Sequence, residues 1–141
     1  MRIMIADDKS WLRSALRLLL EHEGNFEVVG EVESVDLLPS AISRDQPDVL
    51  VLNWQLPGIS TSSARRQLTA TLHEIHPQLL IVALADDHTG KSSLLQGADA
   101  YVNLAEPPDR ILPTLKQAAA QQMSIHPLIV PPFLQGTYPL M

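Results

Sequence analysis

The fold is decided by residues 47–58, whose sequence is Pro47-Asp48-Val49-Leu50-Val51-Leu52-Asn53-Trp54-Gln55-Leu56-Pro57-Gly58. Four aliphatic residues, Val49 to Leu52, stand between turn signals, which is typical of a strand buried on both faces of a parallel sheet. Pro57-Gly58 then closes the segment into a loop. Asn53 falls where the strand ends. Because ligands bind at the carboxyl edge of open α/β sheets, chemistry is expected near Asn53.

Short apolar runs alternate with helical patterns along the rest of the chain. We expect strands at residues 3–6, 26–32, 49–52, 79–84 and 100–102. Apolar residues at helical spacing predict helices at residues 10–23, 35–45, 60–75, 89–96 and 108–122, with Ser10 as the first N-cap. This alternation predicts a flavodoxin-like, doubly wound (βα)5 fold with a parallel five-stranded sheet in the order 2-1-3-4-5.

Composition excludes several classes of function. The net charge is −6, and phosphate contacts need clustered Lys and Arg, so we expect no nucleic-acid binding by this chain alone. The basic pair Arg65-Arg66 is expected on a solvated helix face. There is no cysteine, which removes thiol nucleophiles and zinc–thiolate sites. No apolar run reaches membrane-spanning length and no signal-peptide layout is present, so we expect a cytoplasmic protein.

Several short motifs occur in order along residues 1–120: Asp7-Asp8, Phe26-Glu27-Val28-Val29-Gly30-Glu31, Pro47-Asp48, Leu56-Pro57-Gly58 and Gly97-Ala98-Asp99-Ala100-Tyr101. Together they resemble the receiver domain of bacterial two-component response regulators, most closely the NarL/FixJ type. Met123-Ser124-Ile125-His126-Pro127 is similar to the linker that precedes a LuxR-type DNA-binding domain in that family. The sequence leaves open whether such a domain belongs to a longer parent.

The resemblance implies phosphoryl transfer from a histidine kinase to an aspartate, but the positions that carry this chemistry are altered. The acceptor position is Asn53, whose neutral amide is not a usable nucleophile. The switch hydroxyl position falls on Ala85 and the lysine position on Leu104. The aromatic switch position is kept as Tyr101. Spacing around Ala85 also predicts a shortened fourth helix, on the family's usual partner face.

The acidic pair Asp7-Asp8 matches the family's Mg²⁺ site. Hard cations prefer carboxylate oxygens, so weak binding of Mg²⁺ or Ca²⁺ stays open. The alternative is that one carboxylate caps the following helix and the other is solvated. No cofactor is certain from the sequence.

A few other side chains have two competing interpretations. Trp11 and Trp54 lie near the expected site, either exposed at an interface or packed in the core. His73 and His76 share a helix face at i, i+3, and surface positions are favoured over metal ligation.

We therefore expect a receiver domain at residues 1–122 and a proline-rich apolar tail or linker at 123–141. The favoured function is an atypical receiver in two-component signal transduction, which acts as a phosphorylation-independent interaction or dimerisation module and not as an enzyme. Its expected partner is a protein or a second copy of the chain. The alternatives are a phosphorelay receiver regulated by a divalent cation or a substitute acceptor, and a pocket for a small molecule.

Overall fold

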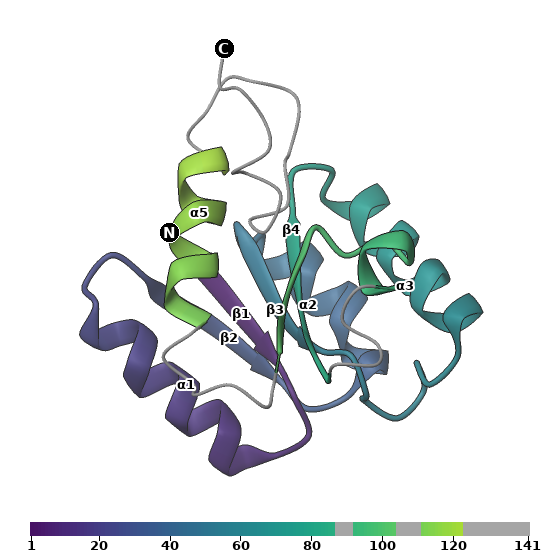
Figure 1. The fold of residues 1–141 in the computed structure, drawn as a ribbon, viewed down its shortest axis with the longest axis horizontal. Helices are drawn as coiled ribbons and strands as arrows, with labels where there is room; N and C mark the ends of the chain where they lie inside the picture. Colours follow the sequence, from purple (N-terminus) through teal and green to yellow (C-terminus); the bar gives the residue numbers. More distant parts are fainter. Residues whose placement is uncertain (87–91, 104–110, 123–141) are drawn as a thin grey trace.

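The protein is built on one parallel sheet, seen in a computed structural model that describes residues 1–86, 92–103 and 111–122 (Figure 1). The strand order is β2-β1-β3-β4-β5, which confirms the flavodoxin-like topology predicted from the sequence. All four strand pairings are parallel. The strands are β1 (Arg2–Ala6), β2 (Glu27–Val32), β3 (Val49–Asn53), β4 (Leu80–Ala85) and β5 (Ala100–Asn103).

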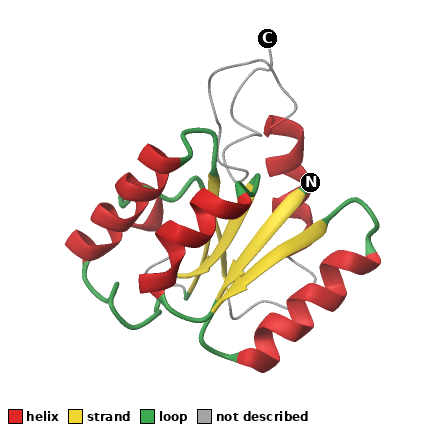
Figure 2. Cartoon of the chain, turned by 180° about the vertical axis from the view of Figure 1, so that it is seen from behind, coloured by secondary structure: helices red, strands yellow, loops and turns green. Residues whose placement is uncertain are grey.

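Helices cover both faces of the sheet (Figure 2). Leu16, Leu20, Ile111 and Leu115 bring α1 and α5 onto one face. The opposite face is covered by α2 and α3. The described helices are α1 (Ser10–His22), the short 3₁₀ helix η1 (Val35–Leu37), α2 (Leu38–Asp45), α3 (Ser62–Ile75) and α5 (Ile111–Gln122).

Strand β3 lies at the centre and connects two hydrophobic cores. All five of its residues are buried. Val49 and Val51 pack on the α1/α5 side, whereas Leu50 and Leu52 pack on the α2/α3 side, as the two-residue period of a strand requires. The continuous aliphatic run is therefore explained by burial on both faces.

Most helix boundaries follow the predicted signals, and the first N-cap differs. Lys9 occupies the N-cap position of α1 without a side-chain cap, so the assignment of Ser10 as N-cap was wrong. Pro39 is accommodated because α2 begins beside it. Thr61 caps α3 through a 3.1 Å bond that its hydroxyl accepts from the Ala64 N–H.

Residues 92–95 form a single helical turn in the described part of the predicted fourth helix. The beginning of that helix, the Pro108 start of α5 and the tail 123–141 lie outside the described residues. Gly97 ends the turn with a φ of +108°, a conformation that favours glycine. Ala98 then donates its N–H to the Ser93 carbonyl at 3.0 Å.

Gly97 offers a direct test of this close packing. An added Cβ would collide with the Thr69 hydroxyl and lie 2.7 Å from Thr69 Cβ. We expect Gly97→Ala to lower the free energy of unfolding by about 3 kcal/mol, from strain and overpacking together. Gly24→Ala is the control, because Gly24 also has a positive φ but nothing within 4 Å, so it should lose only about 1 kcal/mol. Equal losses in urea titrations would contradict this account.

Candidate functional site

The predicted site residues converge on the carboxyl edge of the sheet. Ala6 is paired with Leu52, and Asn53 with Leu84, so the loops after β1, β3 and β4 begin at the same level. Asp7, Asp8 and Asn53 therefore belong to one edge, as the topology predicts.

Asp7 is the buried carboxylate of this edge, with no solvent exposure. Its Oδ1 accepts the Lys9 N–H at 2.9 Å, and its Oδ2 is buried without a hydrogen-bond partner. Burial raises the pKa of Asp7 above its ordinary value, although the Lys9 N–H, the Lys9 charge and the Asn53 side chain all lower it. Asp8, by contrast, is exposed.

Asn53 ends β3 and is only 3% exposed. Its Oδ1 accepts the Gln55 N–H at 2.9 Å, which shapes the turn after the strand. The side-chain oxygen thus accepts a backbone hydrogen bond that belongs to the turn after β3. A neutral amide at this position also adds no second negative charge beside the buried Asp7.

The other two switch positions have ordinary packing. Ala85 is fully buried in the α2/α3 core, and Tyr101 is half-buried against the same core. Leu104, the predicted lysine position, lies outside the described residues. The signalling roles assigned to Ala85, Tyr101 and Leu104 remain predictions.

The resemblance assigns Mg²⁺ to Asp7 and Asp8, and the residues present do not fit a firmly held divalent cation. The Lys9 Nζ lies 4.0 Å from Asp7 Oδ1 and 3.7 Å from Asp8 Oδ1, so an ammonium already faces both carboxylates. Within the described ranges, no group of three His, Asp or Glu side chains could hold a metal. Weak binding stays a prediction.

Trp54, directly after Asn53, is fully buried. Of the two interpretations of this side chain, packing in the core is therefore confirmed, and exposure at an interface is wrong. Its indole Nε1 donates to Gln96 Oε1 at 3.0 Å. Its carbonyl oxygen accepts two bonds from Arg65, at 3.1 Å from Nε and 2.9 Å from Nη2. The Arg65 guanidinium also lies 5.5 Å from the centre of the indole ring.

Arg65 was wrongly expected on a solvated helix face, since it is only 8% exposed. Burial lowers its pKa, and the negative charge of Asp86 acts in the opposite direction. The signal was present in the sequence: Arg65, Thr69 and Leu72 follow the i, i+4, i+7 spacing of one helix face, and all three are buried. Thr69 completes the network by donating to the Gln96 carbonyl at 2.9 Å.

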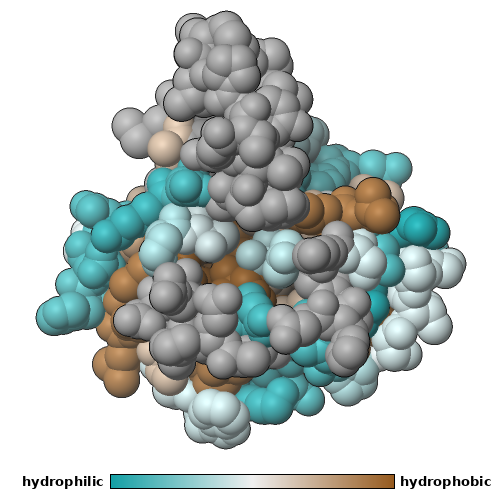
Figure 3. All heavy atoms as spheres, in the orientation of Figure 1, coloured by the Kyte–Doolittle hydropathy of each residue, from teal (hydrophilic) through white to brown (hydrophobic). Residues whose placement is uncertain are grey.

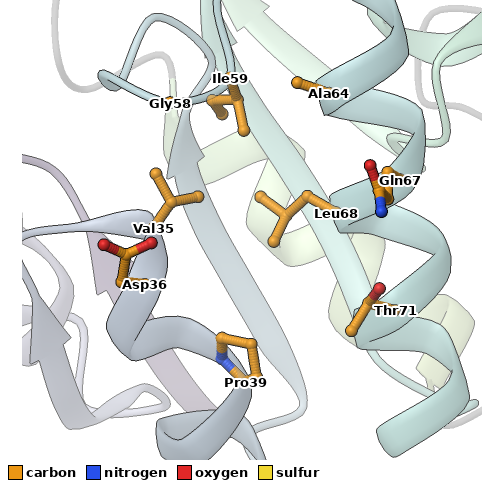
Figure 4. Close-up of a pocket in the computed structure, with 9 residues that line it drawn as sticks. All are labelled: Val35, Asp36, Pro39, Gly58, Ile59, Ala64, Gln67, Leu68 and Thr71. Carbon is orange, nitrogen blue, oxygen red and sulfur yellow. The ribbon is translucent and has the colours of Figure 1, made fainter.

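A groove of about 340 Å³ lies between α2 and α3, on the α2/α3 side of the sheet (Figure 4). Val35, Asp36 and Pro39 line one wall, and residues of α3 line the other, with Gly58 and Ile59 from the loop between β3 and α3. Asn53, Ala85 and the acidic pair do not line it. It is therefore distinct from the polar edge at which a small-molecule pocket was expected.

His73 and His76 each contact a backbone carbonyl oxygen. His73 Nε2 lies 3.1 Å from the Leu79 carbonyl oxygen and 3.4 Å from Asp99 Oδ2. His76 Nε2 lies 2.7 Å from the Pro47 carbonyl oxygen. Each imidazole therefore faces a backbone carbonyl of a different loop, so the pair is not arranged around a shared ion.

The structure defines a doubly wound α/β domain with carboxylates at the carboxyl edge of its sheet, and comparison with known proteins identifies the family. The response regulator receiver domain family matches residues 3–116, so this chain belongs to it. It is therefore a receiver domain of two-component signalling. Within the described residues, no helix has the length and apolarity needed to cross a bilayer.

Curated relatives include the nitrate/nitrite response regulator homologue of Haemophilus influenzae, 27% identical over 98% of this chain and 66% of the relative. The transcriptional regulatory protein DegU of Brevibacillus brevis is 25% identical over 91% of this chain and 54% of the relative. The chain thus spans between about half and two-thirds of these relatives. A LuxR-family response regulator structure from Aurantimonas shares the fold, with a TM-score of 0.73 at 22% identity and 89% coverage of both chains.

His73 predicts a pH-dependent contribution to stability. Hydrogen bonding to Asp99 raises the pKa of His73, so its contribution is fully present below the unfolded pKa of about 6.5 and is lost as pH rises through the folded value. His73→Gln should lower the free energy of unfolding by about 0.5 to 1 kcal/mol more at pH 5.5 than at pH 8.5. The exposed His22→Gln is the control, and a pH-independent loss for His73→Gln would contradict the role of its charge.

Proposed function

We propose that this receiver domain is a cytoplasmic, non-enzymatic interaction module of bacterial two-component signalling, and that its interactions do not depend on phosphorylation. The observation that carries this proposal is the placement of Asn53. The acceptor-equivalent position offers a buried amide, and its oxygen is occupied by the Gln55 N–H at 2.9 Å. An amide in that role cannot attack a phosphoryl donor as a carboxylate does.

The surroundings of Asn53 support the same conclusion. Ala85 has no hydroxyl that could follow a phosphoryl group, and it is fully packed in the core. The Trp54 indole connects the segment after β3 to Gln96, directly after the helical turn 92–95, through a buried hydrogen bond. Arg65 of α3 donates twice to the Trp54 carbonyl. These contacts hold that turn in one position without a phosphoryl group. We propose that the presented surface is therefore constant.

A second function, a phosphorelay receiver with a substitute acceptor, is favoured only by the carboxylates that remain. Asp7 Oδ2 has no hydrogen-bond partner, and Asp8 is exposed. However, Asp7 has no solvent exposure, and the Lys9 ammonium faces both groups. Neither carboxylate is as accessible and unpaired as an attacking group requires.

Phosphorylation is tested by incubating the chain with acetyl phosphate and Mg²⁺ and measuring its intact mass. The mass should stay unchanged, because no carboxylate stands at position 53. As a positive control, Asn53→Asp with Ala85→Thr and Leu104→Lys should regain phosphoryl uptake. Asn53→Asp alone should regain less, because clustered carboxylates without the lysine repel the incoming group. A stoichiometric adduct on any Asp of the unaltered chain would contradict the proposal.

We further propose that the chain forms a homodimer to which its tail contributes. The tail is rich in apolar residues, which in water would form a patch of the kind that marks interaction sites. Closed two-fold dimers are the commonest homo-oligomers. Leu95, on the helical turn 92–95, is 80% exposed and adds an apolar group to the described surface. The apolar tail residues are Leu128, Ile129, Val130, Phe133, Leu134 and Leu140.

Light scattering of the full chain and of a version that ends at Gln122 tests this assembly. The full chain should be a dimer at micromolar concentration, with or without acetyl phosphate, and the shortened chain should be monomeric. A monomeric full chain at high micromolar concentration refutes the dimer. An unchanged dimer after truncation keeps the dimer and removes the tail from its interface.

A further inference from the structure

Lys9 is placed where it can serve the acidic pair that precedes it. Its backbone N–H donates to Asp7 Oδ1 at 2.9 Å, and its extended backbone, with φ of −95° and ψ of 108°, begins α1. From there the side chain returns to the edge of the sheet. Its Nζ lies 3.7 Å from Asp8 Oδ1 and 4.0 Å from Asp7 Oδ1.

The acidic pair needs a positive charge nearby. Asp7 is fully buried, and its Oδ2 has no hydrogen-bond partner. A buried carboxylate with one oxygen unpaired is costly, and a cation close to it offsets part of that cost. The Lys9 ammonium supplies that charge from within the chain, and it ranks among the influences that lower the Asp7 pKa against burial.

We propose that the Lys9 ammonium is the resident counter-ion of Asp7 and Asp8 and that it keeps divalent cations out of this site. The inference rests on the proposed function only in treating Asp7, Asp8 and Asn53 as the altered acidic site of the receiver. It adds a reason why that site does not respond to Mg²⁺.

The Lys9 ammonium and a divalent cation at this site would repel each other. A Mg²⁺ or Mn²⁺ ion bridging both carboxylates would take oxygen ligands at roughly 2.0 to 2.2 Å. The ammonium, at 3.7 and 4.0 Å from the same oxygens, would then be an adjacent like charge. The Lys9 charge therefore opposes metal binding for as long as its side chain, which is 49% exposed, faces the acidic pair.

The balance of charge at the acidic pair determines how tightly a divalent cation binds there. With Asn53 in place of a third acid, the acidic pair itself carries two carboxylates, and the Lys9 ammonium offsets one of their two charges. Removing the ammonium leaves both negative charges of the pair without this counter-ion. Divalent affinity should therefore rise when Lys9 loses its charge.

The test is a Mn²⁺ titration of the full chain, followed by the electron paramagnetic resonance signal of free Mn²⁺. Lys9→Gln should bind Mn²⁺ at least about tenfold more tightly than the unaltered chain. Lys9→Arg should restore the weak binding, because it restores the cation. Lys116→Gln is the matched control, since Lys116 is an exposed lysine that pairs with Glu23 at 3.0 Å. It should bind as the unaltered chain does.

The added affinity must also depend on the acidic pair. Lys9→Gln combined with Asp8→Asn should lose the gain. The inference is overturned if the unaltered chain binds Mn²⁺ as tightly as Lys9→Gln does, if Lys116→Gln gives the same gain, or if the gain survives Asp8→Asn. The proposed function is judged separately by the phosphoryl adduct. An unaltered chain that binds Mn²⁺ tightly but takes up no phosphoryl group overturns the inference alone.

Discussion

The burial of Asp7 at the end of the central sheet is the constraint on which the rest of the site depends. The carboxylate has no exposure and one unpartnered oxygen, and burial raises its pKa. A second buried carboxylate at position 53 would add repulsion unless a cation joined the pair. The Asn53 side chain instead lowers the pKa of Asp7, and so does the charge of the Lys9 ammonium, 4.0 Å from Asp7 Oδ1. Both neighbours thus favour the charged form of the buried Asp7 carboxylate.

Around this edge, buried polar contacts connect elements that are distant in sequence. Arg65 from α3 donates twice to the Trp54 carbonyl, and the Trp54 indole donates to Gln96. Thr69 donates to the carbonyl of the same glutamine. Because buried hydrogen bonds are costly to break without replacement, these segments are expected to move together. Two exposed apolar side chains, Leu18 at 72% and Leu95 at 80%, lie outside this network.

Part of the apolar surface visible in one view gathers over α1 (Figure 3). Trp11 and Leu18 are exposed on that helix, seven residues apart and so on nearly one face. Among the described residues, the other large exposed apolar side chains are Leu37 of η1 and Leu95 of the turn 92–95. A constant interaction module needs such surfaces to be available at all times.

Sequence patterns predicted the sheet well because burial on two faces forces uninterrupted aliphatic runs such as Val49 to Leu52. They also placed Asn53 correctly at the edge, since topology alone brings the ends of β1 and β3 together. Sequence patterns did not predict whether a long polar side chain lies in solvent or in the interior. Arg65 turned inward because the Trp54 carbonyl and ring contact its guanidinium. The spacing of Arg65, Thr69 and Leu72 indicates a buried helix face, but it does not specify Trp54 as the partner. For the same reason, the sequence did not predict that the Lys9 ammonium lies near Asp7 and Asp8.

The central claim is that the signalling surface has one state. Amide hydrogen exchange with and without beryllofluoride and Mg²⁺, followed by mass spectrometry, tests it most directly, because this phosphoryl mimic stabilises the switched state wherever an acceptor carboxylate can bind it. The account predicts identical exchange in the peptides that cover residues 54–58 and 92–103. Added protection confined to those peptides would contradict it.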